Sequence, residues 1–409
     1  MKISSLKSLV SLSLMAISVG LISCKKNTNE SKDHEKIDIH NLLTDIMAKE
    51  ENRSGVTGIP LTLQCSGYFS SNPKTFNIGK QSKNGEMITD HSLFQIGGNS
   101  KVFISVVMLQ LEKEGRLSIE DPVSKFLNDK YPLWNNIKIK NILNMTSGIP
   151  NYTDENRVVT DILKQFIKFH FKHITSEEIL DSVKNKPLLD QTKNKYNYSN
   201  TNYVLAAEII KSITGKDISE EILDRIIKPL KLEHTFYIKT FPKENVKFPN
   251  NLIHGYYYTT EEEERIFENG TNIIDFSMSW ANAGISITSN SLDLNTFLRS
   301  LFSGKLLDSE QLKKLTTLVD QNTGEILING VNENNREGYG LGIEARYNSI
   351  LKEIEFTHGG RTFGFRSQMK YFPSKKASFV TAFNSNALLY TNENAFYQNL
   401  DKYIEQNCK

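Results

Sequence analysis

Short polar motifs interrupt the apolar segments of this chain and carry residue types that suit proton transfer. Lysine, tyrosine and histidine side chains act as acids or bases when a fold holds them beside a reacting group. In chain order the motifs are Phe94-Gln95-Ile96-Gly97-Gly98-Asn99-Ser100-Lys101, Ile142-Leu143-Asn144-Met145-Thr146-Ser147-Gly148-Ile149-Pro150, Tyr198-Ser199-Asn200, Tyr339-Gly340-Leu341-Gly342 and His358-Gly359-Gly360, with Gly364-Phe365 beyond. Each candidate also has a plainer interpretation: Lys101 as a structural or solvated lysine, Tyr198 as a core aromatic, and His358 as a structural histidine.

Taken together and in this order, the motifs resemble those of the serine hydrolases of the class C β-lactamase and D-Ala-D-Ala carboxypeptidase group. The resemblance covers residues 55–409. In that family a serine three residues before the lysine is the nucleophile, and the lysine acts on its proton because the two share one helix face. The resemblance implies that Lys101 is this base, Tyr198 the proton shuttle and Asn200 a ligand of the substrate amide. It also implies that His358-Gly359-Gly360 lines the substrate cleft.

The sequence departs from the family pattern at the nucleophile itself. Aligned on Lys101, the serine position holds Gly98, which has no side chain and cannot form an acyl-enzyme. The resemblance still assigns the oxyanion-binding backbone N–H groups to Gly98 and Arg361. The neighbouring Ser100 is a poor substitute nucleophile, because adjacent residues of a helix point about 100° apart.

The elements that must position these residues are predicted from hydrophobic periodicity and turn signals. Predicted strands are residues 56–69, 75–79, 93–96, 339–345, 353–357, 366–372 and 378–384. Predicted helices are residues 102–111, 161–171, 176–183, 202–213, 219–227, 291–301 and 393–406. Strands at both ends with helices between them predict an α/β (α+β) fold of the β-lactamase/transpeptidase-like type, with an antiparallel sheet flanked by helices and an inserted all-helical lobe. We expect the first and last strands to pair in that sheet, with the terminal helix packed on it.

The first 23 residues are predicted to be a lipoprotein signal peptide. Lys2 and Lys7 precede an apolar run over residues 9–22, which is short for a membrane span and suits a signal sequence. The run ends in Leu21-Ile22-Ser23-Cys24, which resembles the lipobox of bacterial lipoproteins. That resemblance implies lipidation of Cys24 and anchoring to a membrane of the bacterial cell envelope, facing the periplasm or the surface. An ordinary signal peptide is the alternative.

The mature chain is expected to begin with a polar segment that leads into one domain. Residues 24–50 are interpreted as a polar tether and the start of the first helix. Residues 51–409 are interpreted as the β-lactamase-related domain. Within it, we expect an α/β lobe from about residues 51–125 and 285–409, and a helical lobe from about residues 126–284.

The composition excludes several classes of protein. The 49 Lys and Arg residues nearly balance 47 Asp and Glu residues, so we expect no nucleic-acid partner. Three cysteines are too few for a disulfide scaffold or a four-thiolate zinc site. His170 and His173 lie in no Glu-bearing zinc motif, so we expect no metal site and no cofactor. Cys65 and Cys408 could pair in an oxidising compartment, but spacing does not decide this and we expect free cysteines.

These observations favour a membrane-anchored, catalytically impaired member of the hydrolase group. Its cleft would bind a peptide, a cell-wall fragment or a small amide or ester. Two alternatives stay open: an active hydrolase with a non-standard nucleophile such as Ser100, and a structural envelope lipoprotein with a vestigial cleft. We expect Gly98→Ser to gain acylation by a labelled penicillin or fluorophosphonate, and replacement of Lys101 in that variant to abolish it. Full turnover is not expected, because Met145 and Thr192-Lys193 replace the family's usual histidine and Pro-Gly.

Overall fold

The computed structural model describes residues 36–65, 72–153, 173–189, 195–241, 250–259, 266–387 and 390–408. Ile37–Lys409 forms one compact unit. The predicted signal peptide, Cys24, the predicted helix at residues 161–171 and Thr192-Lys193 lie outside the described residues. Among the described helices, none is both long enough and apolar enough to cross a membrane.

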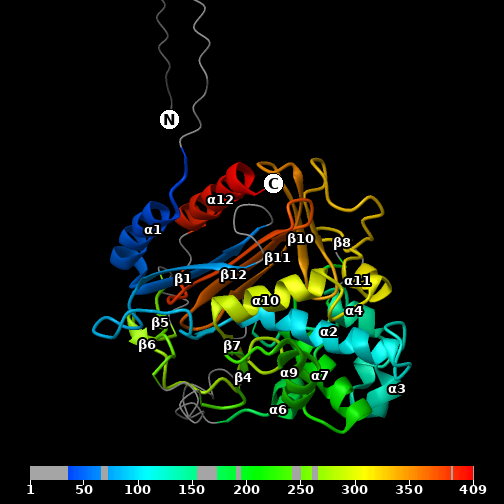
Figure 1. Ribbon diagram of the computed structural model, residues 1–409. Coiled ribbons are helices and arrows are strands. Elements are labelled where there is room, and N and C mark those ends of the chain that lie inside the picture. The colour runs from blue at the N-terminus through cyan, green and yellow to red at the C-terminus, as the bar shows by residue number, and fades with distance from the viewer. Residues whose placement is uncertain are drawn as a thin grey trace, which may run out of the picture. The chain divides into compact units, whose positions relative to one another are not determined.

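An antiparallel sheet of eight strands forms the centre of the fold (Figure 1). Its strand order is β2-β1-β13-β12-β11-β10-β9-β8. In that order the strands are β2 (Lys74–Gly79), β1 (Gly58–Gln64), β13 (Ala377–Phe383), β12 (Arg366–Phe372), β11 (Glu353–Arg361), β10 (Glu344–Asn348), β9 (Glu337–Tyr339) and β8 (Val319–Asp320). The sheet therefore combines strands from the two ends of the chain, as the sequence predicts.

The pairing of β1 with β13 joins the chain ends directly. The two strands run antiparallel, with Leu61 opposite Thr381 and Gln64 opposite Ser378. This confirms the prediction that the first and last strands share one sheet. Six of the seven residues of β1 and all of β13 are buried, because helices cover both faces of the sheet.

Two helices from opposite ends of the chain cover one face of the sheet (Figure 1). They are α1 (Ile39–Ser54) and α12 (Tyr390–Asn407), which pack on each other and on the sheet around a shared apolar core. Asp38 caps α1 by accepting a hydrogen bond from the Asn41 backbone N–H at 2.8 Å. The packing of the terminal helix on the sheet is therefore as predicted.

The opposite face of the sheet packs against α10 (Ser291–Phe302) and α2 (Ser100–Lys113), within the larger of the apolar cores (Figure 1). The other helices and turns are η1 (Gly97–Asn99), α3 (Ser124–Leu127), η2 (Asn128–Lys130), η3 (Pro132–Trp134), α4 (Ile139–Leu143), α6 (Ser176–Asp181), α7 (Asn200–Thr214), α8 (Ile218–Ile222), η4 (Leu223–Ile227), α9 (Lys228–Leu230) and α11 (Ser309–Leu315). The remaining strands are β3 (Phe94–Gln95), β7 (Ile287–Ser289) and β4 (Phe236–Tyr237) in one small sheet, and β5 (Tyr256–Tyr257) with β6 (Thr271–Asn272) in another. The mixed antiparallel architecture agrees with the predicted fold class.

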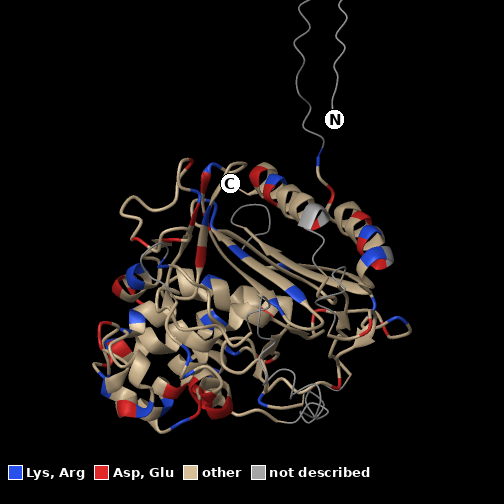
Figure 2. Cartoon of the chain, turned by 180° about the vertical axis from the view of Figure 1, so that it is seen from behind, with Lys and Arg blue, Asp and Glu red and all other residues tan. Residues whose placement is uncertain are grey.

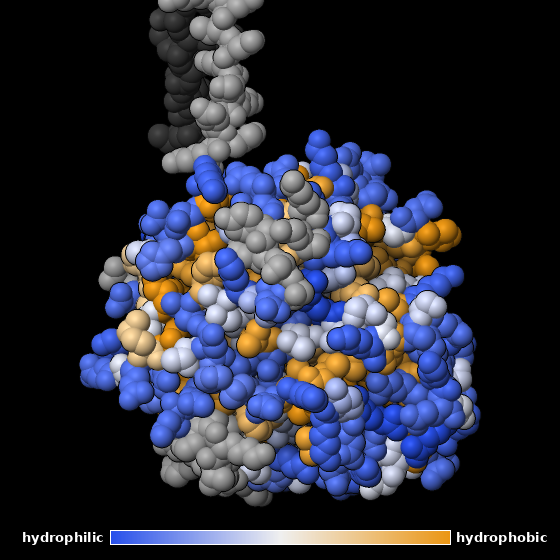
Figure 3. Space-filling model, viewed as in Figure 1, coloured by the Kyte–Doolittle hydropathy of each residue, from blue (hydrophilic) through white to orange (hydrophobic). Residues whose placement is uncertain are grey.

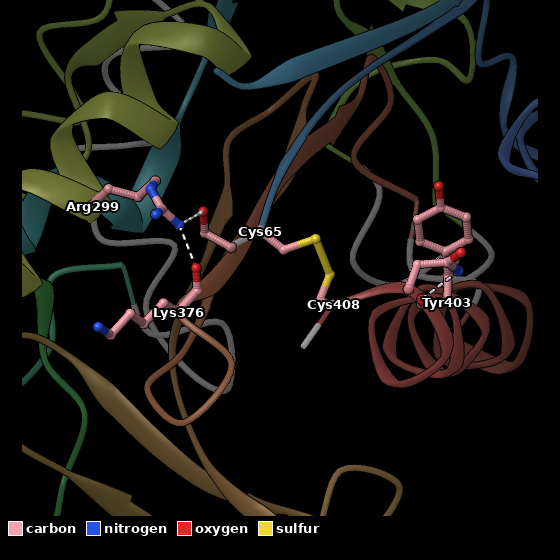
Figure 4. The surroundings of a disulfide bond; sticks show 7 residues. Cys65, Arg299, Lys376, Tyr403 and Cys408 are labelled. Atoms are coloured by element: carbon pink, nitrogen blue, oxygen red, sulfur yellow. Dashed lines mark hydrogen bonds between the residues drawn. A yellow bond between two sulfur atoms is a disulfide. The ribbon is translucent and has the colours of Figure 1, made fainter. Parts of the chain in front are cut away.

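A disulfide bond between Cys65 and Cys408 fastens α12 to the sheet (Figure 4). Cys65 directly follows β1 and Cys408 directly follows α12, and their Cα atoms lie 5.5 Å apart. The expectation of free cysteines is therefore wrong, because tertiary packing brings together residues that lie 343 positions apart. Disulfides of this kind stabilise a folded protein by about 2–4 kcal/mol.

Charged residues of both signs intermix on the surface of the helical part (Figure 2). Asp224, for example, accepts from Lys216 and Lys228 at 2.8 Å each. Figure 3 shows hydrophilic side chains over most of the viewed face, with small groups of hydrophobic residues between them. Most of the large apolar side chains instead fill the two cores on either side of the sheet.

Candidate functional site

The start of α2 is held in place by the turn that precedes it. Strand β3 leads into the 3-10 turn η1, and Gly97 adopts a positive φ of 55°, which glycine tolerates without strain. The Asn99 side chain donates to the Ile96 carbonyl at 2.9 Å and to the Ser367 hydroxyl at 2.8 Å. These bonds fasten the helix start to strand β12 and so fix the direction of the side chains that follow.

Strand β11 approaches this turn so closely that only glycine fits at two positions. A Cβ atom on Gly360 would overlap the Ile96 carbonyl oxygen. A Cβ atom on Gly98 would lie 2.8 Å from the Gly359 carbonyl oxygen and 2.9 Å from the His358 ring. Gly359 itself has room, since the nearest atom outside its chain neighbours is the Gln368 side-chain oxygen at 3.5 Å. The space that a nucleophilic side chain would need at position 98 is therefore occupied.

Lys101 is fully buried beneath this closed turn. Its Nζ donates a long hydrogen bond of 3.4 Å to the Gly284 carbonyl and lies 5.0 Å from the Tyr198 ring and 5.7 Å from the Tyr203 ring. Burial lowers the pKa of Lys101 to about 7, although Glu344 opposes the shift. Its amine can therefore be neutral near physiological pH, as a general base requires. Position 98, however, has no hydroxyl group from which the amine could take a proton.

Replacing Lys101 with methionine is expected to stabilise the protein, most of all at acidic pH. Below pH 7 the native protein must bury a charged ammonium group. Between the native pKa of about 7 and the ordinary 10.5, the unfolded chain holds a proton that the native chain lacks, so wild-type stability rises with pH. We expect a gain of about 2–4 kcal/mol for Lys101→Met at pH 6, shrinking steadily above pH 7. Urea unfolding at pH 6 and pH 9 measures it. The exposed Lys113→Met serves as control, and an equal gain at both pH values would contradict the assignment.

Tyr198 lies over the Lys101 amine, as the resemblance implies. It is 39% exposed and meets the Tyr339 ring edge-on at a centroid distance of 6.4 Å. Desolvation, followed by the nearby Tyr196 and Glu344, raises the pKa of Tyr198 well above its ordinary value of 10. The phenol therefore keeps its proton at neutral pH.

Asn200 begins helix α7, and its side chain is used within the protein. Its Nδ2 donates to the Thr153 hydroxyl at 2.6 Å, and its backbone N–H donates to the Asn151 side chain at 3.0 Å. Met145 supports the same motif from below, since its sulfur accepts a hydrogen bond from the Ser199 backbone N–H at 3.4 Å. The residue that replaces the family's histidine therefore contacts the Tyr-x-Asn motif directly.

His358 is a buried neutral histidine. Its Nδ1 lies 2.6 Å from the Gly359 carbonyl, an acceptor only, so Nδ1 carries the proton and Nε2 accepts from the Tyr339 hydroxyl at 3.3 Å. Burial, which outweighs an opposing effect of Glu344, lowers the pKa of His358 to about 4. The ring therefore presents no positive charge to a ligand at pH 7.

The two remaining candidates from the sequence, Ser100 and Arg361, differ in whether they lie at the motif site. The Ser100 hydroxyl accepts a hydrogen bond from the Ile287 backbone N–H at 3.2 Å, so it faces strand β7 within the buried interior. Arg361 lies at the turn: a Cβ atom on Gly97 would be 2.5 Å from the Arg361 amide nitrogen. The geometry thus brings Gly98, Lys101, Tyr198, His358 and Arg361 together, while Ser100 points elsewhere.

Sequence reasoning missed three contributors to this site. The Gly284 carbonyl accepts from Lys101, and the Tyr203 hydroxyl donates to the Leu143 carbonyl at 2.8 Å beneath the same amine. Tyr339 holds His358 through its hydroxyl. Tyr339 belongs to the fourth motif and could have been found there, whereas no local pattern marks Gly284.

A cavity of about 320 Å³ lies apart from these motif residues. Its lining includes Lys130, His173, Lys211, Tyr237 and Ser286. None of the catalytic candidates named above contributes to it. The cavity therefore does not mark the motif site, whose Lys101 and His358 side chains are almost fully buried.

Comparisons with known proteins place the chain in a family. The Beta-lactamase family model matches residues 75–401. Teichoic acid D-alanine hydrolase of Staphylococcus aureus is 26% identical over 172 residues, which are 42% of this chain and 38% of that protein. The chain spans half or less of the length of the curated relatives it matches first.

Two solved structures share the fold over most of the chain. D-stereospecific amidohydrolase from Streptomyces sp. is 26% identical with a TM-score of 0.69, and the match covers 85% of this chain and 94% of that one. D-amino acid amidase from Ochrobactrum anthropi SV3 is 25% identical with a TM-score of 0.70, and the match covers 90% and 98%. Since the family model spans most of the sequence, the chain belongs to the Beta-lactamase family of serine hydrolases, which is the family that its motifs resemble.

Proposed function

We propose that this protein is a catalytically impaired, lipid-anchored member of the Beta-lactamase family that binds a cell-wall fragment or peptide without hydrolysing it. The observation that carries the proposal is the state of position 98. Gly98 offers no nucleophile, and the Gly359 carbonyl and the His358 ring fill the space where its side chain would stand. Loss of a nucleophile costs about 10⁶-fold in turnover. Ser100 is no replacement, because its hydroxyl bonds to strand β7.

The proposed ligand contains a D-amino acid whose carbonyl carbon is in an amide or ester bond. The relatives supply this class, since their names refer to teichoic acid D-alanine, to a D-stereospecific amidohydrolase and to D-amino acid amides. Tyr198 and Arg361 are the exposed residues among those gathered at the motif site, and the aromatic face of Tyr198, at 39% exposure, suits contact with such a ligand.

The proposal is tested by mass spectrometry and calorimetry on the same protein. Intact-protein mass spectrometry after treatment with a labelled penicillin or a fluorophosphonate should show no adduct. Calorimetric titration with D-alanyl-D-alanine peptide should show binding that Tyr198→Ala weakens about tenfold, whereas Tyr347→Ala, on β10, leaves it unchanged. An adduct on Ser100 would establish the alternative of an active hydrolase. Absence of both adduct and binding would favour a structural envelope lipoprotein.

The cell envelope is the proposed location. The lipobox at Cys24 supports it at the level of sequence, and the disulfide between Cys65 and Cys408 supports it independently, because such bonds persist in oxidising compartments. A lipid on Cys24 would anchor the protein to a membrane of the cell envelope, with the domain facing the periplasm or the surface.

Cys24→Ser is expected to release the protein from the membrane. One acyl chain binds a membrane only marginally and two or more hold stably, so removal of the lipidated residue should be decisive. Fractionation after a salt wash should find wild type in the membrane pellet and the variant in the supernatant. Cys65→Ser, which breaks the disulfide and leaves the lipobox intact, is the control. A variant that stays in the pellet would contradict lipid anchoring.

A further inference from the structure

Two histidines far apart in the sequence meet on the surface, outside the motif site. His91 Nδ1 lies 2.9 Å from His234 Nε2, and the sequence separation is 143 residues. His91 is exposed and His234 is partly exposed. Neither residue takes part in the chemistry that the family motifs describe, so their pairing needs its own explanation.

The same helix start holds both histidine-bearing loops. At the beginning of α10, the Asn290 side chain donates to the Asp90 carbonyl at 2.7 Å. One turn further, the Asp293 carboxylate accepts from the His234 backbone N–H at 2.7 Å and from the Thr235 hydroxyl at 3.0 Å. Beyond each histidine, the chain enters strands β3 and β4, which both pair with β7. The two imidazoles therefore stand on a rigid frame and do not meet through loose loops.

The rings of His91 and His234 do not lie in line with each other. The ring centroids lie 4.6 Å apart and the two nitrogens 2.9 Å apart, a difference of 1.7 Å. In a straight hydrogen bond the two ring radii would add about 2.3 Å to the nitrogen separation. The rings are therefore inclined to the line between the nitrogens, and their planes are tilted by 40° to each other. An ion about 2 Å from each nitrogen, which is the length of a metal–imidazole bond, would lie to one side of the line that joins them.

The charges around the pair suit a cation. Each histidine directly follows an acidic residue in the sequence, Asp90 before His91 and Glu233 before His234. The Asp293 carboxylate faces His234 from α10 and interacts electrostatically with both His234 and Glu233. Three carboxylates thus lie on the elements that carry or support the two imidazoles.

We propose that His91 and His234 form a surface binding site for a divalent transition-metal ion, with water completing the coordination. The described residues contain no cluster of three or more His, Cys, Asp or Glu side chains placed to hold a metal, so the protein contributes two ligands. Two nitrogens 2.9 Å apart and about 2.05 Å from one ion subtend roughly 90° at it. That angle matches neighbouring positions of tetragonal Cu²⁺ or Ni²⁺, whereas tetrahedral Zn²⁺ needs a wider angle. The site therefore prefers Cu²⁺ and Ni²⁺ to Zn²⁺.

The test uses the mature protein, stripped of metal with a chelator and titrated at pH 7.5. Copper binding is followed by electron paramagnetic resonance with glycine as competitor, and Ni²⁺ and Zn²⁺ binding by calorimetry. We expect one Cu²⁺ site whose spectrum shows two imidazole nitrogens, and tighter binding of Ni²⁺ than of Zn²⁺. His91→Gln and His234→Gln should each weaken Cu²⁺ binding by about 100-fold, since a chelating second ligand acts at a high effective concentration. His40→Gln, an exposed histidine on α1, should change nothing.

Two results would overturn the proposal. If the copper spectrum of the double variant His91→Gln/His234→Gln equals that of wild type, the metal sits elsewhere and the pair is only a hydrogen bond. If Zn²⁺ binds more tightly than Ni²⁺, the coordination angle inferred here is wrong. Thermal unfolding of the metal-free variants should match wild type, because both side chains lie at the surface, so a loss of binding is not a loss of fold.

Discussion

The Gly98→Ser variant should remain unlabelled by penicillin and fluorophosphonate, contrary to what the motifs alone predict. The new Cβ would lie 2.8 Å from the Gly359 carbonyl and 2.9 Å from the His358 ring. Overpacking of this kind costs about 1–3 kcal/mol and displaces the groups involved. A misplacement near 1 Å lowers the rate of a preorganised site by about 10²-fold. The serine would therefore be present but badly placed against Lys101.

Removing the His358 ring should allow the acylation that Gly98→Ser alone does not show. We expect Gly98→Ser combined with His358→Ala to be acylated, because the ring that a Cβ at position 98 would meet at 2.9 Å is gone. Adding Lys101→Met to that pair should abolish labelling, since the base is removed. Intact-protein mass spectrometry compares all of them, with His358→Ala alone as the control without a nucleophile. Labelling of Gly98→Ser by itself would show that the turn is looser than these distances imply.

The second large effect is expected at the buried ion pairs of Arg366. Its Nη2 lies 3.0 Å from the Glu50 carboxylate on α1, its Nε bonds to Glu393 on α12, and its Nη1 donates to the Ser385 carbonyl at 2.8 Å. Side-chain exposure is only 5% for Arg366, 0% for Glu50 and 11% for Glu393. Arg366→Met would leave two buried carboxylates without the guanidinium group that they contact, at a cost of about 3–5 kcal/mol.

Urea unfolding measures this loss of stability, and two further variants serve as its controls. Lys138→Met breaks a pair with Glu120 whose side chains are 49% and 52% exposed, and should cost at most about 0.5 kcal/mol. Adding Glu50→Gln and Glu393→Gln to Arg366→Met should recover most of the stability, because the stranded charges are removed. A loss below about 1 kcal/mol for Arg366→Met would mean that water reaches the pairs.

Much of the fold follows from local patterns. Apolar runs predict β1, β12 and β13, and apolar periodicity predicts α7 and α10, because strand and helix place side chains with different periods. The family motifs likewise identify the residues that meet at the turn before α2. What these patterns do not contain is the partner of each element, since pairing depends on residues hundreds of positions away.

The sequence by itself identified the family and the glycine at position 98, and its motifs predicted that Lys101, Tyr198 and His358 belong to one site. Only the tertiary structure showed that strand β11 fills the space above Gly98. The identity of a residue as glycine does not tell whether the space around it is open or filled. It alone decided the disulfide between Cys65 and Cys408, because the pairing of β1 with β13 and the packing of α12 bring those residues together. Residue types and their spacing along the chain indicate the local chemistry. The free space around a residue, its burial and its long-range contacts depend on how distant segments pack.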